Sequence, residues 1–184
     1  AKSDQAYDGV DLRRVVALVD RPSGGTYAVD VMMAEGNQTH TFDLPVHFKG
    51  QLIETSLDFR HATERLEPLG TQAGYQHLWK TAESDTVLSG ALSDLSVLVN
   101  DQFYTMSFAA SRDAKTFLTR LGANDPDNNL RNEQALIVRA NGNASTFVTV
   151  YERHGRYDND EEVTVFSGSS IEGIELDEQG GAKI

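Results

Sequence analysis

Apolar and polar residues alternate with a period of two along most of the chain, which is the pattern of strands with one buried face. No segment keeps apolar residues in a helical repeat for three full turns. The alternation predicts eleven short strands, over residues 10–19, 27–34, 39–44, 50–57, 75–82, 92–99, 102–109, 135–139, 146–152, 162–166 and 171–176. The chain is therefore expected to be an all-β protein.

Short strands in this number are most economically arranged as two packed sheets. We expect a two-layer antiparallel β-sandwich of about ten strands. It should form a single domain over residues 1–184. The last residues, 176–184, are acidic and contain glycine, so they are expected to form a frayed tail.

Residues that tolerate a positive φ separate many of the predicted strands. Asn100-Asp101 and Asn141-Gly142-Asn143 are each expected to form a hairpin turn. Residues 110–119 carry polar positions that weaken a helix, so they are predicted to be a loop or an edge strand. Two connections, 60–74 and 121–132, are long. Connections of this length in a compact domain usually have a function or dock on another surface.

The composition narrows the classes of function. A formal net charge of -12 repels nucleic acid and anionic lipid, so nucleic-acid binding is not expected. The absence of cysteine excludes disulfides, thiolate zinc sites and cysteine nucleophiles. No apolar run is long enough to predict a membrane span. The start at Ala1 fits a chain cut from a longer one, although removal of an initiator Met would look the same.

One acidic stretch partly matches a calcium loop. Asp125, Asp127 and Asn129 alternate as the first three oxygen ligands of such a loop do. The positions of the turn glycine and of the last glutamate, however, hold Leu130 and Leu136. A turn-rich surface loop is the favoured interpretation.

His40, Asp43 and His47 are of the residue types that bind zinc. On a regular strand, however, His40 faces the side opposite to Asp43 and His47, and Pro45 interrupts the ladder. We interpret these residues as hydrogen-bonded structural groups and predict no metal site in this chain.

Tyr75, His77 and Trp79 occupy alternate positions of a predicted strand and would therefore share one face. Aromatic rings stack on the C–H faces of sugars, and Tyr or His can transfer protons, so this face is a candidate carbohydrate cleft. A half-buried structural face is the competing interpretation and is slightly favoured.

Cationic donors are concentrated in the sequence Arg153-His154-Gly155-Arg156. In an acidic chain they could form a positive rim that faces a polyanion. A solvated loop is the commoner explanation for such a cluster, because nearby acidic residues can neutralise it. These acidic residues are Asp158, Asp160, Glu161 and Glu162.

Four sequence segments are more specific than these general patterns. They are DLPVHFKGQ (43–51), LG (69–70) running to GYQHLW (74–79), LGANDP (121–126) and FVTVYERHG (147–155). In this order they resemble the C-terminal portion of oligoalginate lyases of the heparinase II/III-like superfamily. The resemblance covers about residues 40–155, and residues 7–20 look like the strand that opens the same region.

The resemblance implies a two-part enzyme, with an α-helical toroid followed by antiparallel β-sheets, that cleaves uronate chains by β-elimination. Members of the family are exported to the periplasm or the cell surface. Their catalytic Tyr, His and Asn residues and their zinc ligands come from the helical part and the start of the β part. None of those motifs occurs here, so no catalytic or metal residue is carried over.

The resemblance therefore predicts that this chain is the C-terminal β-domain portion of a lyase and is inactive alone. Its partners would be an acidic polysaccharide or oligosaccharide and the missing helical domain, which should dock on an unusually apolar face. A free-standing carbohydrate-binding module and a purely structural sandwich are the alternatives. The candidate substrate-cleft residues are Lys49, Tyr75, His77, Trp79, Arg153 and His154.

Overall fold

The computed structural model describes residues 1–21, 24–84, 93–122, 133–176 and 181–184. A single 3-10 turn, η1 (Tyr75–His77), accompanies the strands in these residues. The strands are β1 (Lys2–Tyr7), β2 (Val10–Asp20), β3 (Thr26–Phe48), β4 (Gln51–Thr55), β5 (Phe59–His61), β6 (Glu67–Pro68), β7 (Leu78–Ser84), β8 (Ser93–Val99), β9 (Gln102–Ala110), β10 (Ala114–Leu121), β11 (Gln134–Asp158), β12 (Val163–Val165), β13 (Glu175–Leu176) and β14 (Ala182–Lys183). No helix in these ranges is long and apolar enough to cross a membrane.

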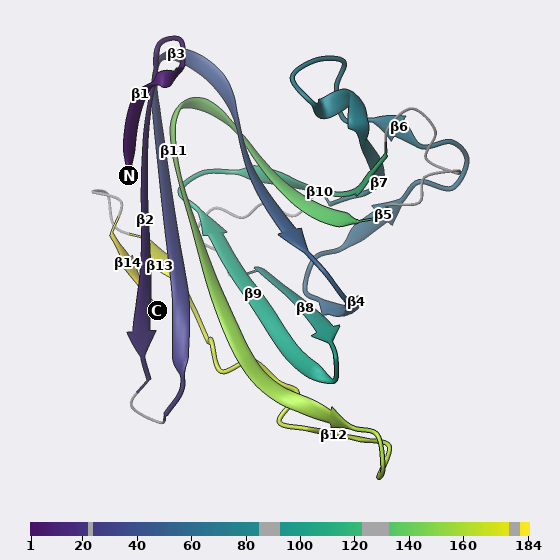
Figure 1. Ribbon diagram of the computed structural model, residues 1–184. Helices are drawn as coiled ribbons and strands as arrows, with labels where there is room; N and C mark the ends of the chain where they lie inside the picture. Colours follow the sequence, from purple (N-terminus) through teal and green to yellow (C-terminus); the bar gives the residue numbers. More distant parts are fainter. Residues whose placement is uncertain (22–23, 85–92, 123–132, 177–180) are drawn as a thin grey trace.

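Two long strands, β3 and β11, bend midway and contribute to both layers of a sandwich (Figure 1). In the first layer, β11 pairs with β10, and β10 pairs with β7. In the second layer, β9 lies beside the other half of β11, while β2 and β1 continue from β3. The prediction of an all-β antiparallel sandwich is confirmed.

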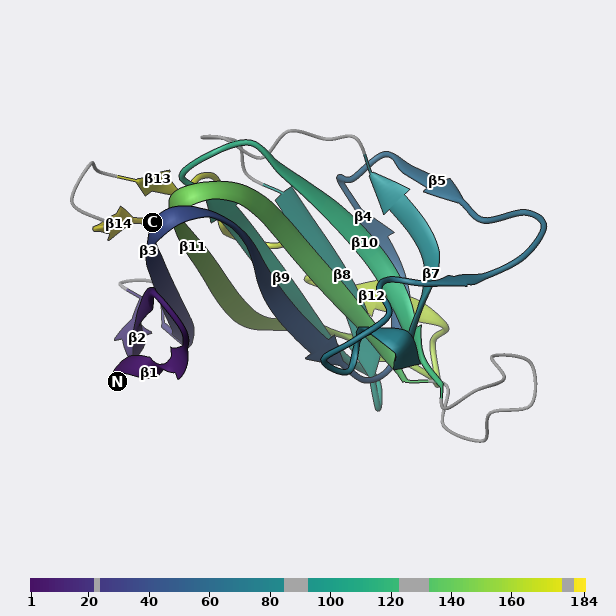
Figure 2. The same cartoon turned by 90° about the horizontal axis from the view of Figure 1, so that it is seen from above.

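The main core lies between the layers (Figure 2). It is filled by alternate residues of the strands, because successive side chains point to opposite faces of a sheet. Each fully buried side chain of this size stabilises the fold by about 1.5–3 kcal/mol. Members from β3 are Phe42, Leu44, Val46 and Phe48, and members from β8 and β9 are Leu95, Val97, Met106 and Phe108.

Two predicted strand breaks are wrong. Residues 27–34 and 39–44 belong to the single strand β3, and residues 135–139 and 146–152 belong to β11. Asn141-Gly142-Asn143 is therefore no hairpin but a bulge, where the pairing with β3 shifts between Gly142 and Ala144. The same flexible residues serve a bulge and a turn, which is why the sequence was misread. The hairpin at Asn100-Asp101 is confirmed, with φ angles of 47° and 66°.

The prediction of a loop or an edge strand over residues 110–119 is also wrong. The strand in this stretch, β10, is an interior strand between β7 and β11 rather than a loop or an edge. Thr116 and Thr119 are buried in it, at 0% and 1% exposure. Because these buried residues are polar, the sequence of β10 lacks the apolar pattern of an interior strand. Of the two long connections, 60–74 contains β6 and the end of β5, whereas most of 121–132 lies outside the described residues.

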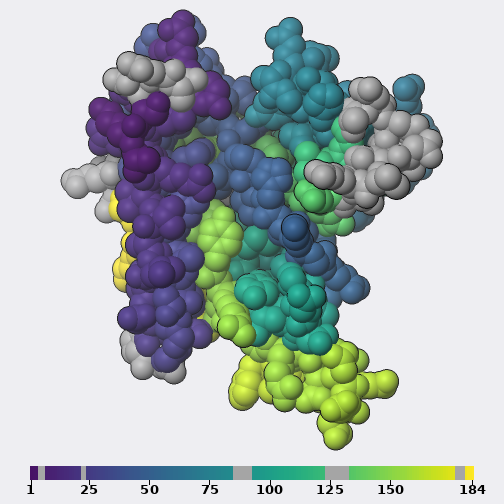
Figure 3. All heavy atoms as spheres, viewed as in Figure 1, coloured from purple at the N-terminus to yellow at the C-terminus, as the bar shows by residue number. Residues whose placement is uncertain are grey.

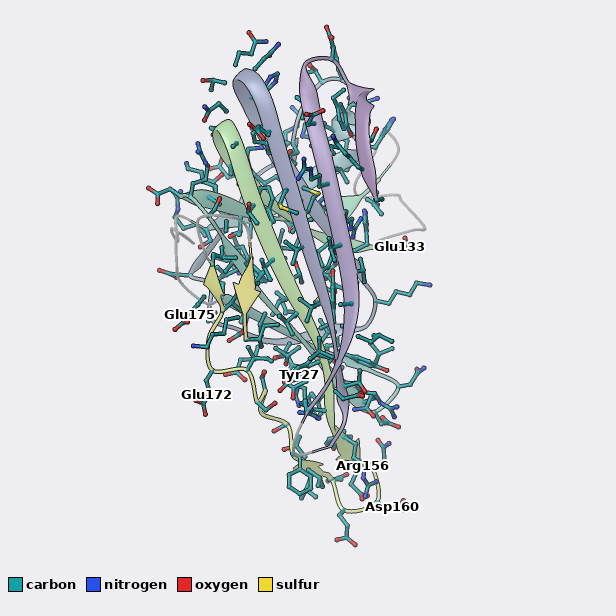
Figure 4. All side chains as sticks on the ribbon, turned by 90° about the vertical axis from the view of Figure 1, so that its left-hand side faces the viewer. Tyr27, Glu133, Arg156, Asp160, Glu172 and Glu175 are labelled. Carbon is teal, nitrogen blue, oxygen red and sulfur yellow. The ribbon has the colours of Figure 1, made fainter. Side chains whose placement is uncertain are left out.

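The C-terminal segment packs on the outer face of the second layer, as the yellow trace past Glu172 and Glu175 shows in Figure 4. Ile171 and Ile174 are buried there against Val29, Val148 and Val150. Ala182–Lys183 then pairs with Glu175–Leu176, so the tail predicted to be frayed contains ladder pairs. The segment and the strands beneath it thus form a second, smaller core.

Candidate functional site

A cleft of about 700 Å³ opens between the β1–β2 hairpin and the segment that ends in η1. In Figure 3 the surface is hollowed between these two parts, with β3 beneath them. Apolar residues such as Met32, Phe42 and Ile137 line much of it. Its polar groups come from three elements and are Tyr7, Asp8, His40, Thr41, Asp43, His47 and Tyr75. An apolar surface with a few polar groups is typical of small-ligand sites.

An ion pair behind the cleft fixes Asp43, which lines it. Nε of Arg139 donates to Oδ1 of Asp43 at 2.8 Å, and a terminal nitrogen of Arg139 donates to Oδ2 at 2.7 Å. The guanidinium also lies 5.3 Å from the Phe117 ring centre and 5.7 Å from that of Tyr75. The two parallel hydrogen bonds fix the orientation of the carboxylate, and the guanidinium packs against the Tyr75 ring.

Tyr75 is held in its protonated form. Burial, together with the hydrogen bond to Asp43 and the negative charge of that residue, raises the pKa of the Tyr75 hydroxyl well above its ordinary value. A tyrosine that acts as a general base needs the opposite shift. In this arrangement the Tyr75 oxygen can accept a hydrogen bond from a ligand hydroxyl, but it is poorly suited to take up a proton as a base.

His40 lies at the bend of β3, beside Gly36 and Phe42. Its ring centre is 5.9 Å from that of Phe42. A Cβ at residue 36 would collide with the imidazole, so glycine there allows the close approach. Nε2 of His40 is buried and has no hydrogen-bond partner in the described part of the chain. His40 therefore brings an unsatisfied buried nitrogen to the lining of the cleft.

The predicted aromatic face is only partly correct. Gly74, with φ of 90°, precedes the 3-10 turn Tyr75–His77, and the strand begins only at Leu78. Of the predicted three, Tyr75 alone lines the cleft, whereas His77 is exposed and Trp79 is half-buried on β7. The expectation that Tyr75, His77 and Trp79 share one strand face is wrong, because the turn breaks the alternation. Lys49 is exposed in the turn between β3 and β4 and does not line the cleft.

Arg153 and His154 lie elsewhere, at the end of β11 that pairs with β12, far from β6 and β7 (Figure 1). Nε2 of His154 bonds the Thr105 hydroxyl at 2.8 Å, and Nδ1 bonds the carbonyl of Phe166 at 3.0 Å. The side chain of Phe166 is 85% exposed beside them. The structure therefore separates the candidate residues into a cleft and a distant basic tip.

Of the residues considered for metal binding, Asp43 already has a partner. His40, Asp43 and His47 all line the cleft, but Asp43 is paired with Arg139. Among the described residues, no group of three or more His, Asp or Glu side chains could hold a metal ion. The calcium-like residues Asp125, Asp127 and Asn129 lie outside the described residues.

Sequence reasoning missed a smaller cationic pocket of about 250 Å³ beside β5 and β7. Lys80 and Arg60 both bind Glu83 there, at 2.8 Å and 2.9 Å, and Arg65 and His61 also line it. The hydrogen bond from Lys80 lowers the pKa of Glu83, which therefore stays ionised and neutralises part of the charge. Arg139 was missed as well, because its pairing with Asp43 depends on the register of strands far apart in sequence.

Two known proteins match essentially the whole chain. An exo-oligoalginate lyase of Saccharophagus degradans is 34% identical over 189 residues, which cover 100% of this chain and 25% of that protein. An alginate lyase of Stenotrophomonas maltophilia is 36% identical over 192 residues, covering 97% of this chain and 26% of its own length. Over its length the chain is therefore similar to a part of two alginate lyases.

The match confirms the resemblance to alginate lyases that the four segments suggested. The chain spans about a quarter of the length of each alginate lyase. No family model matches it. Both alginate lyases align across the strands that carry the cleft and the basic tip.

Proposed function

We propose that this chain is the C-terminal β-domain portion of a lyase that cleaves alginate or a related uronan, and that it is not catalytic alone. The observation that carries the proposal is the match of the complete chain to one quarter of two alginate lyases. In the longer protein the chain would line the substrate cleft. The catalytic residues, and the zinc that the resemblance implies, would belong to the upstream part.

The chemistry of the cleft supports a binding role. In β-elimination a base removes the proton at C5 of the uronate, a double bond forms between C4 and C5, and the 4-O-glycosidic bond breaks. Tyr75 is held protonated and Asp43 is ion-paired with Arg139, so neither is a ready base. The oxygens of both groups can instead accept hydrogen bonds from the hydroxyls of a sugar.

The test compares this chain with its full-length parent on alginate oligomers, measuring the ultraviolet absorbance of the new C4–C5 double bond. We expect turnover by the parent only. In the parent, Lys49→Ala and His77→Ala should lower turnover less than removal of an upstream catalytic tyrosine. Turnover by the chain alone would overturn the non-catalytic role, and no turnover by either protein would overturn alginate as the substrate in favour of another uronan or of the binding-module function below.

The basic tip favours a second candidate function, that of a carbohydrate-binding module. Phe166 is 85% exposed, and Arg153 and Arg156 line the same shallow pocket of about 500 Å³. An exposed ring beside guanidinium groups suits stacking on, and ion pairing with, a uronate. Binding of alginate oligomers by this chain, lost in Phe166→Ala but unchanged in Ile53→Ala, would favour this function. Ile53 is also exposed but lies away from the tip.

The proposal includes export of the longer protein to the periplasm or the cell surface, where polymeric alginate is accessible. Fractionation of the source cells, with antibodies against this chain, tests that location directly. Detection in the cytosol alone would contradict export without affecting the proposed chemistry.

A further inference from the structure

The strand β2 has the sequence of an interior strand but lies near the edge of its sheet. Residues 15–19 read Val-Val-Ala-Leu-Val, a continuous apolar run that is typical of strands covered on both faces. In the structure, however, Val15, Val16, Leu18 and Val19 are 55%, 64%, 77% and 44% exposed. Edge strands usually carry charges or proline that discourage pairing, and residues 15–19 carry neither.

The exposed side chains lie on both faces of the sheet. Val15 and Val19 stand opposite Val31 and Tyr27, which pack on the small C-terminal core. Val16 and Leu18 project from the other face, since neighbouring residues of a strand alternate. A ligand lying on one face would therefore leave half of this apolar surface in water.

Among the described residues, the outer edge of β2 is unpaired along the same stretch, while its other edge pairs with β3. β1 pairs with β2 only as far as Arg14, whose N–H donates to the Ala1 carbonyl at 2.9 Å and whose carbonyl accepts from the Ala1 amino group at 2.7 Å. In the described part of the chain, no strand pairs with this edge beyond Arg14. Because hydrogen-bonding directions alternate, the N–H and C=O groups of Val16 and Leu18 point outward at this edge.

We propose that the edge of β2 from Val15 to Asp20 is the docking site of an extended strand, supplied by the polypeptide that precedes Ala1 in the full-length lyase. This inference rests on the proposed function. Lys2 pairs with Arg13 and Ser3 with Leu12, so the same register places the residue before Ala1 opposite Val15. Six upstream residues continuing β1 in this register would reach Asp20.

The continuity of the ladder favours this occupant over a second copy of the chain. β1 already lies along the edge in the correct direction, and the alginate lyases extend well beyond the matched segment. A second copy would have to begin pairing next to the end of β1, where it would compete with an intramolecular strand of high effective concentration. Flanking upstream elements would then cover the two apolar faces of β2.

Hydrogen exchange of backbone amides tests the proposal. In this chain, the amides of Val16 and Leu18 should exchange rapidly, whereas those of Val15 and Ala17, which point toward β3, should be protected. In the full-length protein, Val16 and Leu18 should become protected by a factor on the order of 100 or more. Rapid exchange of both amides in a folded full-length protein would overturn the proposal.

Two proline variants give a second readout. Leu18→Pro removes only an outward N–H, so this chain should tolerate it, whereas the full-length protein should lose stability and Tm. Ala17→Pro removes an N–H that points toward β3, so it should destabilise both proteins. Equal losses from Leu18→Pro in both proteins would contradict an upstream strand at this edge.

The outcomes separate this proposal from the proposed function. Protection of Val16 and Leu18 in a full-length protein without lyase activity would support the docking strand and overturn the function. Rapid exchange of these amides in an active full-length lyase would support the function and overturn the docking strand. Protection that appears in this chain alone, and rises with concentration together with a dimer in sedimentation, would overturn the proposal in favour of a second copy.

Discussion

Asp43 on β3 and Arg139 on β11 stand directly opposite each other in the ladder and join through two hydrogen bonds of 2.8 Å and 2.7 Å. Their side chains are 6% and 24% exposed. The same guanidinium lies over the ring of Tyr75, so the pair links the first layer to the turn η1. The pair therefore positions two residues that line the cleft, Asp43 and Tyr75.

Arg139→Ala should destabilise this chain by about 3 kcal/mol, because it leaves the carboxylate of Asp43 buried without its partner. Urea unfolding monitored by fluorescence measures the change in the free energy of unfolding. Lys183→Ala is the control, since its pair with Glu175 is 80% and 76% exposed and should contribute less than about 0.5 kcal/mol. Equal effects of the two substitutions would show that the pair at Arg139 is not structural.

The strands were predictable where alternation and turn chemistry agree. The hairpin at Asn100-Asp101 follows β8 and precedes β9 as expected, because both residues adopt the positive φ of a tight turn. The same reasoning gave a wrong prediction at Asn141-Gly142-Asn143, where β11 continues through a bulge. Whether a flexible residue ends a strand or bends it depends on its partner strand, and β3 is distant in sequence.

The site was less predictable than the fold, for the same reason. Tyr75 was identified, but the pattern placed it on a strand, whereas the left-handed Gly74 starts a 3-10 turn there. Asp43 and Arg139 are 96 residues apart, so only the register of β3 on β11 brings them together. The similarity to alginate lyases was indicated by four sequence segments and not by any arrangement of catalytic or binding groups.

Gly155→Ala should destabilise the basic tip by about 2 kcal/mol or more. A Cβ at Gly155 would overlap the backbone of Val165 and Phe166, and its φ of +23° is unfavourable for other residues. The Phe166 carbonyl also accepts from His154, so its displacement would disturb that contact. Thermal unfolding measures the loss as a lower Tm. Gly168→Ala is the matched control and should not lower Tm, because nothing lies within 4 Å of the added carbon.

The C-terminal segment should detach at acidic pH because of Glu152, which is 1% exposed. Burial raises the pKa of this carboxyl, but hydrogen bonds from Ser170 and Ser169 outweigh burial and hold the pKa below 4.5. A lowered folded-state pKa stabilises the protein above the unfolded-state value, and this contribution is lost as pH falls through the folded-state value.

Glu152→Gln tests this linkage. The variant should be less stable than the parent chain at pH 7 by about 1–3 kcal/mol, because it loses the charge that pairs with Arg21. The difference should shrink as pH falls below the ordinary carboxyl pKa of 4.5, because the carboxyl of the unfolded chain takes up a proton there before the native one does. Urea titrations across this range measure both curves. A difference that stays constant with pH would mean that Glu152 does not carry the acid sensitivity.

Tyr75→Phe separates binding from proton transfer in the full-length lyase. If the Tyr75 hydroxyl only binds substrate, its loss removes one hydrogen bond and should raise KM about 10-fold, with kcat nearly unchanged. The pH profile should not shift, because the raised pKa keeps this hydroxyl protonated over the working range. Tyr104→Phe, at an exposed position on β9, should leave both constants unchanged. A fall in kcat of about 100-fold or more would instead identify Tyr75 as the proton-transfer group and overturn the binding role.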